Sequence, residues 1–292
     1  MAESVRVRAA AKVNLHLRVY GRRKDGFHGI LSLFQAVSLA DTIVLRSWTE
    51  SDTIEIDGDF GCTVTETTIY KAVCAYREAS GDRTGLSLKV DKRVPAGAGL
   101  GGGSSDAAAT LLGLQSLRGG SLSPSILAEM GASIGSDVPF FLSAAAAIVS
   151  GRGEVVEPIR ARSDFSVLIA FPGFSVPTAG AYALLDRERP DESEEPDPSP
   201  DELIAFYRGE IGEWPFANSF ERVIGVSRPE IGQAKSMLLR AGASFAAMSG
   251  SGSSIFGVFE DGAGIEKAKD GLVAAGFEAY SAAPLARCST LD

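Results

Sequence analysis

Residues 95–106 read PAGAGLGGGSSD, and this stretch says more about the fold than any other part of the chain. Glycines at positions 97, 99, 101, 102 and 103 allow the backbone to wrap closely around a ligand and to turn its N–H groups inward. Ser104 and Ser105 add hydroxyl groups, and strong helix formers follow at 107–117 (AAATLLGLQSL). The positive N-terminal end of that helix points into the loop. We therefore predict an anion site suited to a chain of phosphates.

Other nucleotide motifs fit this stretch less well. Gly97-x-Gly99-x-x-Gly102 matches the dinucleotide fingerprint, but residues 92–95 intervene after the preceding strand and residues 115–128 contain no acid. The chain has no Gly-Lys dipeptide, which excludes a phosphate loop of Walker type. Residues 59–61 (DFG) imitate a protein-kinase element without its HRD and VAIK partners. A turn without a ligand remains the alternative, although so many glycines are costly for a mere turn.

Hydrophobic periodicity on both sides of the loop predicts mixed strands and helices. We expect single strands at 5–8, 14–19, 86–90, 165–170, 245–249, 255–259 and 279–283, and a strand pair formed by 42–45 and 53–56. We expect helices at 69–80, 107–117, 123–134, 231–241 and 265–275, with Ser123 as an N-cap before Pro124. Strands and helices do not alternate regularly, so the pattern predicts an α+β fold.

Composition and charge narrow the class of protein. The chain has 292 residues, 45% of them hydrophobic and 22% charged, which is typical of a globular protein of one or two domains. The net charge is −9, and residues 186–202 (DRERPDESEEPDPSPDE) carry −7 of it, so the rest carries only −2. No basic stripe of the kind that binds nucleic acid is present. We predict that 186–202 is a solvated, mobile loop.

Cysteine usage and hydropathy bear on the compartment. Cys62, Cys74 and Cys288 are odd in number and lack a CxxC spacing, which argues against a disulfide framework and a structural zinc site. No apolar run reaches the length of about 20 residues that a membrane span needs. The N-terminal MAESVRVRAAAKVN has no apolar core of a secretory signal. We expect a cytoplasmic protein with no membrane partner.

Single residues elsewhere are ambiguous when taken alone. Lys12 leads into an apolar strand and could be a solvated edge residue, and Asp137 in GSDVPFF could be a turn or cap residue. His16 alternates with apolar neighbours and could be structural or exposed, whereas His28 lies beside Phe27 in a loop where it could stack or donate. A second Gly/Ser turn at 248–254 (MSGSGSS) indicates that two such loops meet at one phosphate site.

Taken together, these stretches resemble the GHMP kinases, a family of small-molecule kinases. Residues 95–111 (PAGAGLGGGSSDAAATL) resemble the second motif of the family, and 249–259 (SGSGSSIFGVF) its third. Residues 11–30 (AKVNLHLRVYGRRKDGFHGI), 33–43 (LFQAVSLADTI) and 135–142 (GSDVPFFL) are similar to the branch that acts on a cytidine-diphosphate-linked methylerythritol. The resemblance extends from about residue 9 to 285 and is weakest over 186–215.

This resemblance implies a two-domain GHMP-kinase fold with the active site in the cleft between the domains. We place the domains at 1–155 and 156–292. The implied activity is transfer of a phosphoryl group from ATP, with Mg²⁺, to the 2-hydroxyl of the cytidyl compound. Kinases of homoserine, mevalonate or a sugar remain the alternative within the family. A nucleotide-binding regulatory protein without catalysis is the alternative outside it, and the presence of both Lys12 and Asp137 argues against it.

The resemblance also implies roles for particular residues. Lys12 and Asp137 fall on the catalytic lysine and aspartate, and Asn14 falls where the substrate is contacted near them. Phe27, His28 and Tyr182 fall where the family stacks against the cytosine ring and recognises it by hydrogen bonds. We expect Gly102 or Gly103 to need a backbone conformation, or a close approach of the backbone, that a side chain blocks. The expected ATP-phosphate loop consists of Pro95, Ala96, Gly97, Ala98, Gly99, Leu100, Gly101, Gly102, Gly103, Ser104 and Ser105.

Overall fold

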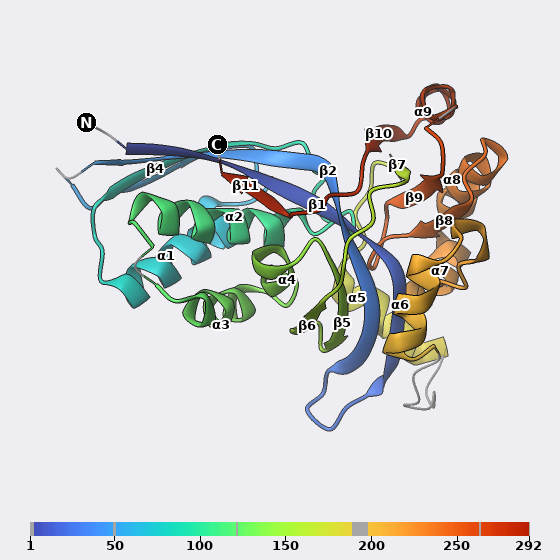
Figure 1. Cartoon of the computed structure of the whole chain (residues 1–292), viewed down its shortest axis with the longest axis horizontal. Helices are drawn as coiled ribbons and strands as arrows, with labels where there is room; N and C mark the ends of the chain where they lie inside the picture. Colours follow the sequence, from blue (N-terminus) through green and yellow to red (C-terminus); the bar gives the residue numbers. More distant parts are fainter. Residues whose placement is uncertain (1–2, 49–50, 121, 189–197, 263, 292) are drawn as a thin grey trace.

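The computed structural model describes residues 3–48, 51–120, 122–188, 198–262 and 264–291. It contains two β-sheets, each accompanied by its own helices, which confirms the predicted α+β class (Figure 1). The seven-stranded sheet has the order β11-β1-β2-β4-β3, with β5 pairing to both β2 and β6. Its strands are β1 (Glu3–Arg22), β2 (His28–Trp48), β3 (Ile54–Asp57), β4 (Gly85–Asp91), β5 (Ala146–Gly151), β6 (Val155–Pro158) and β11 (Ser289–Leu291).

The four-stranded sheet has the order β10-β7-β9-β8 and is antiparallel throughout. Its strands are β7 (Ser166–Phe171), β8 (Phe245–Met248), β9 (Ile255–Phe259) and β10 (Glu278–Ala282). Figure 1 shows its helices, α5 to α9, on the opposite side of the molecule from α1. They are α5 (Thr178–Glu188), α6 (Pro200–Arg208), α7 (Ser219–Ser227), α8 (Pro229–Arg240) and α9 (Ile265–Ala274), with a 3₁₀ turn η2 (Ile211–Glu213).

Four helices pack beneath the seven-stranded sheet in the same view (Figure 1). They are α1 (Thr68–Ser80), α2 (Gly102–Leu117), α3 (Pro124–Ile134) and α4 (Val138–Ser143), preceded by a 3₁₀ turn η1 (Val64–Glu66). Helix α3 begins as predicted, with Ser123 as N-cap and Pro124 in its first turn. Helix α2 begins at Gly102 rather than Ala107, so the last glycines and both serines of the loop form its first turn.

β1 and β2 form a long, bent hairpin that belongs to both halves of the molecule (Figure 1). The prediction of two separate strands at 5–8 and 14–19 is wrong, because β1 runs without a break through both. The register shifts between Ala10 and Ala11, and again between Asn14 and His16. Such bulges re-aim side chains. Accordingly Ala9 packs into the core under the seven-stranded sheet, while Ala11 packs into the core toward the other sheet.

The predicted pairing of 42–45 with 53–56 is also wrong. Residues 42–45 lie within β2, where β1 occupies one edge and β4 the other. β3 therefore has no access to β2 and pairs in parallel with β4 instead. A short apolar run does not indicate which strand it will pair with, because the pairing depends on strands far away in the sequence.

The acidic stretch 186–202 is not a loop at its two ends. Residues 186–188 complete α5, and residues 200–202 open α6. Ser199 and Glu202 form a capping box at the start of α6, with Pro200 in the first turn. Residues 189–197, to which the prediction of mobility chiefly applied, lie outside the described residues.

Two further predictions concern the chain as a whole. The domain boundary at 155/156 stays a prediction; β6, at 155–158, pairs with β5 in the first sheet, and β7 opens the second. Within the described residues, no helix has the length and apolar character to cross a membrane.

Candidate active site

A cavity of about 1440 Å³ collects nearly all the residues singled out in the sequence. It lies between the seven-stranded sheet with its helices and the segments around α5 and α7, which corresponds to the predicted cleft. Ser105 is the exception, because its side chain is buried and does not line the cavity. The predicted residues that do line it are Lys12, Asn14, Phe27, His28, Pro95, Ala96, Gly97, Ala98, Gly99, Leu100, Gly101, Gly102, Gly103, Ser104, Asp137 and Tyr182.

Lys12 lies on β1 between the two bulges and is 3% exposed. Its backbone N–H donates to the carbonyl of Leu100 at 2.9 Å, which ties the strand to the glycine loop. Its Nζ lies 3.6 Å from Asp137 Oδ2 and donates to Asn14 Oδ1. Burial lowers the pKa of Lys12, and the nearby Asp137 carboxylate opposes this shift in part. The alternative of a solvated edge residue is therefore wrong.

Asp137 occupies the N-cap position of α4, one of the alternatives that its sequence context left open. Its side chain nevertheless makes no capping hydrogen bond. The carboxylate is directed to Lys12 instead, and it remains 28% exposed toward the cavity. The result is a carboxylate paired with a buried ammonium group and open on one side, which is the arrangement a general base needs.

Asn14 connects this pair to both loops. Its Nδ2 donates to Ser32 Oγ at 3.0 Å, and its backbone N–H donates to Ser249 Oγ at 3.2 Å. The Ser249 hydroxyl in turn donates to the carbonyl of Gly99 at 2.8 Å. Ser249, which carried no individual prediction, thus joins β1, the glycine loop and the second Gly/Ser turn.

The two Gly/Ser loops meet, as their sequences indicated. Besides the Ser249 contact, the N–H of Ser254 donates to the carbonyl of Ala98 at 3.1 Å. Asn218, just before α7, donates through Nδ2 to the carbonyls of Met248 and Gly250 at 2.7 and 2.8 Å. The second turn is therefore held by backbone contacts from one side and by a side-chain amide from the other.

The glycines that need positive φ are not the ones predicted. Gly102 and Gly103 are helical. A Cβ on Gly103 would make only an ordinary contact, 3.5 Å from Thr68, whereas a Cβ on Gly102 would lie only 3.0 Å from Val94 Cγ1. Gly97, Gly99 and Gly101 have φ of +62°, +78° and +72°. The reason is that α2 begins earlier than expected, so the turn conformations fall before Gly102.

At the other end of the cavity, aromatic rings gather around the β1–β2 turn. His28 and Tyr182 stack directly on each other, with ring centroids 4.9 Å apart and planes at 24°. That distance leaves no gap for a base between them. Phe27 is 55% exposed, and the guanidinium of Arg152 lies 4.9 Å from its ring centroid. Phe27 therefore offers the accessible ring.

Asp186 is a residue that sequence reasoning missed. His28 Nδ1 donates to the carbonyl of Tyr20 at 2.9 Å, and His28 Nε2 lies 3.1 Å from Asp186 Oδ1. Asp186 stands four residues after Tyr182 on α5, so both face the same side of the helix. Recognising 178–188 as a helix would have placed Tyr182 and Asp186 on one face, but the run of charges from 186 onward predicts a loop.

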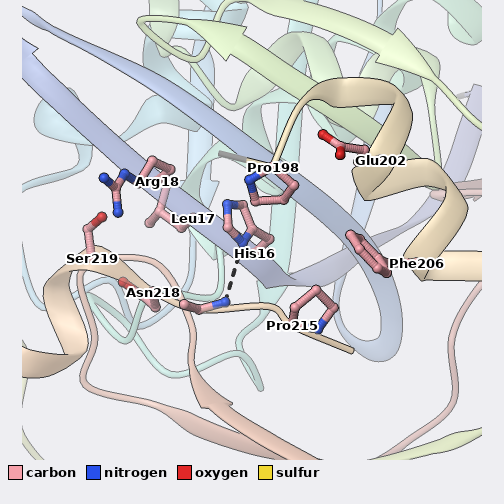
Figure 2. Close-up of a pocket in the computed structure, with 10 residues that line it drawn as sticks. His16, Leu17, Arg18, Pro198, Glu202, Phe206, Pro215, Asn218 and Ser219 are labelled. Atoms are coloured by element: carbon pink, nitrogen blue, oxygen red, sulfur yellow. Dashed lines mark hydrogen bonds between the residues drawn. The ribbon is translucent and has the colours of Figure 1, made fainter. Parts of the chain in front are cut away.

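His16 belongs to a separate, smaller cavity of about 390 Å³. Figure 2 shows its ring between Pro198 and Pro215, with the dashed hydrogen bond from the Ala217 N–H to His16 Nδ1. Burial, and secondarily Arg18, lowers the pKa of His16 to about 4. The residue is buried rather than exposed, and it does not line the cavity that holds Lys12 and Asp137.

Comparisons with known proteins agree with this arrangement. The model described as GHMP kinases N terminal domain matches residues 67–145, and the one described as GHMP kinases C terminal matches residues 204–278. A protein of Treponema pallidum named 4-diphosphocytidyl-2-C-methyl-D-erythritol kinase is 40% identical over 265 residues, which is 89% of this chain and 91% of the relative. One of the same name from Thermodesulfovibrio yellowstonii is 39% identical over 264 residues, covering 89% and 92%.

Solved structures give the same result. A crystal structure of 4-(cytidine 5'-diphospho)-2C-methyl-D-erythritol kinase superposes with a TM-score of 0.81 at 36% identity and covers 97% of this chain and 99% of that one. A homoserine kinase from Cytophaga hutchinsonii superposes with a TM-score of 0.77 at 19% identity and covers 99% and 97%. The second likeness concerns the fold alone.

Proposed function

The chain belongs to the 4-diphosphocytidyl-2-C-methyl-D-erythritol kinases of the GHMP kinase family, and from this membership we infer its reaction and propose the residues that perform it. It is a small-molecule kinase of the non-mevalonate isoprenoid pathway. It transfers the γ-phosphoryl group of ATP to the 2-hydroxyl of 4-(cytidine 5′-diphospho)-2-C-methyl-D-erythritol, and the products are the 2-phosphate and ADP.

The contact between Lys12 and Asp137 is the observation that supports the proposed mechanism most directly. Phosphoryl transfer depends mainly on positioning and on stabilising charge. Asp137, open to the cavity on one side, accepts the proton of the attacking hydroxyl. The oxygen then forms its bond to the γ-phosphorus as the bond to the β-γ bridging oxygen breaks. The proton ends on Asp137, and the electron pair of the broken P–O bond leaves with ADP.

Lys12 supplies a positive charge at the same place. Its ammonium lies 3.6 Å from Asp137 Oδ2, beside the proposed proton acceptor. Because Lys12 is buried, its charge acts through a medium of low dielectric, where it stabilises the transferred phosphoryl group more strongly than in water. Asn14 accepts a hydrogen bond from Nζ and fixes its direction.

We assign the phosphates of ATP to the segment 95–104. Gly97, Gly99 and Gly101 adopt positive φ, a conformation that lets successive N–H groups turn toward one anion. The N-terminus of α2 at Gly102 adds its positive end.

Mg²⁺ would neutralise the phosphates. No group of three His, Cys, Asp or Glu side chains among the described residues is arranged to hold a metal, which fits an ion held mainly by phosphate oxygens and water.

We assign the cytidyl group to Phe27, His28 and Tyr182. The exposed ring of Phe27 provides a stacking face, and the guanidinium of Arg152 supports it. His28 is held by Tyr20 and Asp186, so it can present its Nε2 edge to the base only by exchanging the Asp186 contact for one to the pyrimidine.

We place the enzyme in the cytoplasm, where the free thiols of Cys62, Cys74 and Cys288 are compatible with reducing conditions.

A single-turnover assay tests this assignment. The purified enzyme, in excess over γ-labelled ATP with Mg²⁺, is mixed with the cytidyl compound or with homoserine, and label transfer is followed in time. We expect rapid transfer to the cytidyl compound alone. Faster transfer to homoserine would replace the substrate assignment, and no transfer to either compound would favour a nucleotide-binding protein without catalysis.

A further inference from the structure

A half-buried lysine and two buried carboxylates join the two ends of the phosphate loop. Lys92 follows β4, and its ammonium donates to Asp41 Oδ2 on β2 and to Asp106 Oδ2 on α2, the latter at 2.5 Å. Asp41 is fully buried and Asp106 is 3% exposed. Three elements that are separate in the sequence therefore meet at one ammonium group.

The contacts of Asp41 reach the entry of the loop. Its Oδ1 accepts the backbone N–H groups of Arg93 and Val94, at 2.5 and 2.8 Å, immediately before Pro95. Asp106 lies just after the last loop residue, in the first turns of α2. The three side chains thus hold the residues on both sides of 95–105 in one fixed relation.

Asp106 has a second feature that the mechanism does not use. Its Oδ1 is buried and has no hydrogen-bond partner among the described residues, although the residue lines the cavity that contains the glycine loop. Burial, with a further contribution from Asp41, raises the pKa of Asp106 to about 7 against the opposing effect of Lys92. Burial of Lys92 is outweighed by the two carboxylates, which raise the pKa of its ammonium.

We propose that Asp41, Lys92 and Asp106 form a clamp that fixes the phosphate loop for ATP, and that Asp106 takes up a proton when the nucleotide binds. The proposal rests on the use of ATP by this kinase. Asp106 is a positioning residue, because it acts on the loop through Lys92. Lys92 and Asp41 are the charged groups that act on it within the described part of the chain.

The direction of proton movement follows from charge. With both carboxylates ionised, the clamp carries one net negative charge. The triphosphate brings further negative charge to the same cavity, and like charge nearby favours the protonated form of a carboxyl group. Above neutral pH, nucleotide binding should therefore draw a fraction of a proton onto Asp106, where the unpaired Oδ1 is free to carry it.

Titration calorimetry tests the proton step on the full chain. MgATP is titrated at pH 7.5 in two buffers that differ in ionisation enthalpy, first into the wild type and then into Asp106→Asn. The asparagine keeps an oxygen for Lys92 and cannot titrate. We expect the wild type to take up more protons than Asp106→Asn, at similar affinity. Equal proton numbers in the two proteins would overturn this part of the proposal.

Steady-state kinetics test the clamp. Asp106→Ala removes one anchor, and we expect KM for ATP to rise about tenfold while KM for the cytidyl compound stays the same. Asp106→Asn should keep KM for ATP close to the wild-type value, because the asparagine oxygen can still accept from Lys92. Arg118→Met is the matched control, because it breaks the Arg118–Asp82 ion pair at the far end of the same helix. It should lower Tm without changing KM for ATP.

If Asp106→Ala and Arg118→Met behave alike, the carboxylate is only structural and the clamp is wrong. The calorimetry measures ATP binding without the second substrate. A wild type that binds ATP with proton uptake but leaves the cytidyl compound unphosphorylated would thus contradict the substrate assignment and not the clamp.

Discussion

Gly99 and Ser249 approach so closely that a Cβ on Gly99 would lie 2.0 Å from the carbonyl oxygen of Ser249. The hydroxyl of Ser249 also donates to the carbonyl of Gly99 at 2.8 Å. The phosphate loop is therefore packed backbone to backbone against a turn 150 residues further along the chain. Its shape depends on that contact as much as on its own glycines.

The first prediction follows from this contact. Gly99→Ala should raise KM for ATP at least about tenfold, since the methyl group must displace backbone rather than a flexible side chain. Gly173 is a matched control, with φ of +80° against +78° for Gly99 but no atom within 4 Å of an added Cβ. Gly173→Ala should lose a similar amount of stability, because alanine is strained at positive φ, and should leave KM for ATP unchanged. Equal effects on KM would mean that the close approach is unimportant for ATP.

The second prediction concerns the proposed base. Asp137→Asn should lower kcat by about 10²-fold or more, because the amide cannot accept the hydroxyl proton. Calorimetric affinity for ATP should be nearly unchanged, and the start of α4 should remain, since the carboxylate makes no capping bond. A variant that keeps more than half of the wild-type kcat would remove Asp137 from this role.

The third prediction concerns the cost of burying the Lys12 charge. The lowered pKa of Lys12 means that its ammonium is less stable in the folded protein than in water. Lys12→Met should abolish activity and yet raise Tm, by about 2–4 °C for each kcal/mol recovered. A lower Tm would mean that the contacts to Asp137 and Asn14 outweigh the burial.

The same shift fixes a pH dependence. Below the folded-state pKa of Lys12, both folded and unfolded chains hold the proton, and the difference between wild type and Lys12→Met is constant. Above it the folded state loses its proton first, so the unfolded state binds more protons and wild-type stability rises with pH until the unfolded lysine also titrates near 10.5. Urea denaturation at a series of pH values from 7 to 10.5 should show the advantage of the variant shrinking as the pH rises.

The fourth prediction concerns the cytidyl pocket. His28→Ala and Tyr182→Ala should each raise KM for the cytidyl compound about tenfold, a loss of about 1.4 kcal/mol, with KM for ATP unchanged. The first variant removes the imidazole proposed to contact the base, and the second removes the ring that stacks on that imidazole. Tyr182→Phe keeps the ring that stacks on His28 and should be mild. If both alanine variants leave that KM unchanged, the pocket is elsewhere and His28 only braces the β1–β2 turn.

The sequence predicts some helices and strands of this fold well and others poorly. The N-cap at Ser123 and the helix at 69–80 follow from local signals, and the structure confirms both. The bulges in β1 leave no local signal, because they arise from pairing with β2. The early start of α2 was hidden by glycines, which are unfavourable in a helix interior but occupy its first turn here.

The site shows the same division. Periodicity and spacing singled out the glycine loop, and the family resemblance assigned Lys12 and Asp137, but their contact spans 125 positions of the sequence and could not be read from either neighbourhood. Asp186 was missed because charge suggested a loop where α5 continues. Lys92, Asp41 and Asp106 each have an ordinary sequence context, and only the fold shows that they form one cluster of ion pairs.

The hydrogen bond from the backbone N–H of Asn14 to Ser249 Oγ also has a consequence for synthesis of the chain on the ribosome. The two residues are 235 positions apart, and ribosomes add about 5–20 residues per second, so β1 waits about 12–47 seconds for the turn that completes its hydrogen bonding. During that interval β2 and Ser32 are already present, but the backbone N–H of Asn14 lacks its Ser249 acceptor. Catalytic competence should therefore arise only after the ribosome has delivered the second Gly/Ser turn, at 248–254.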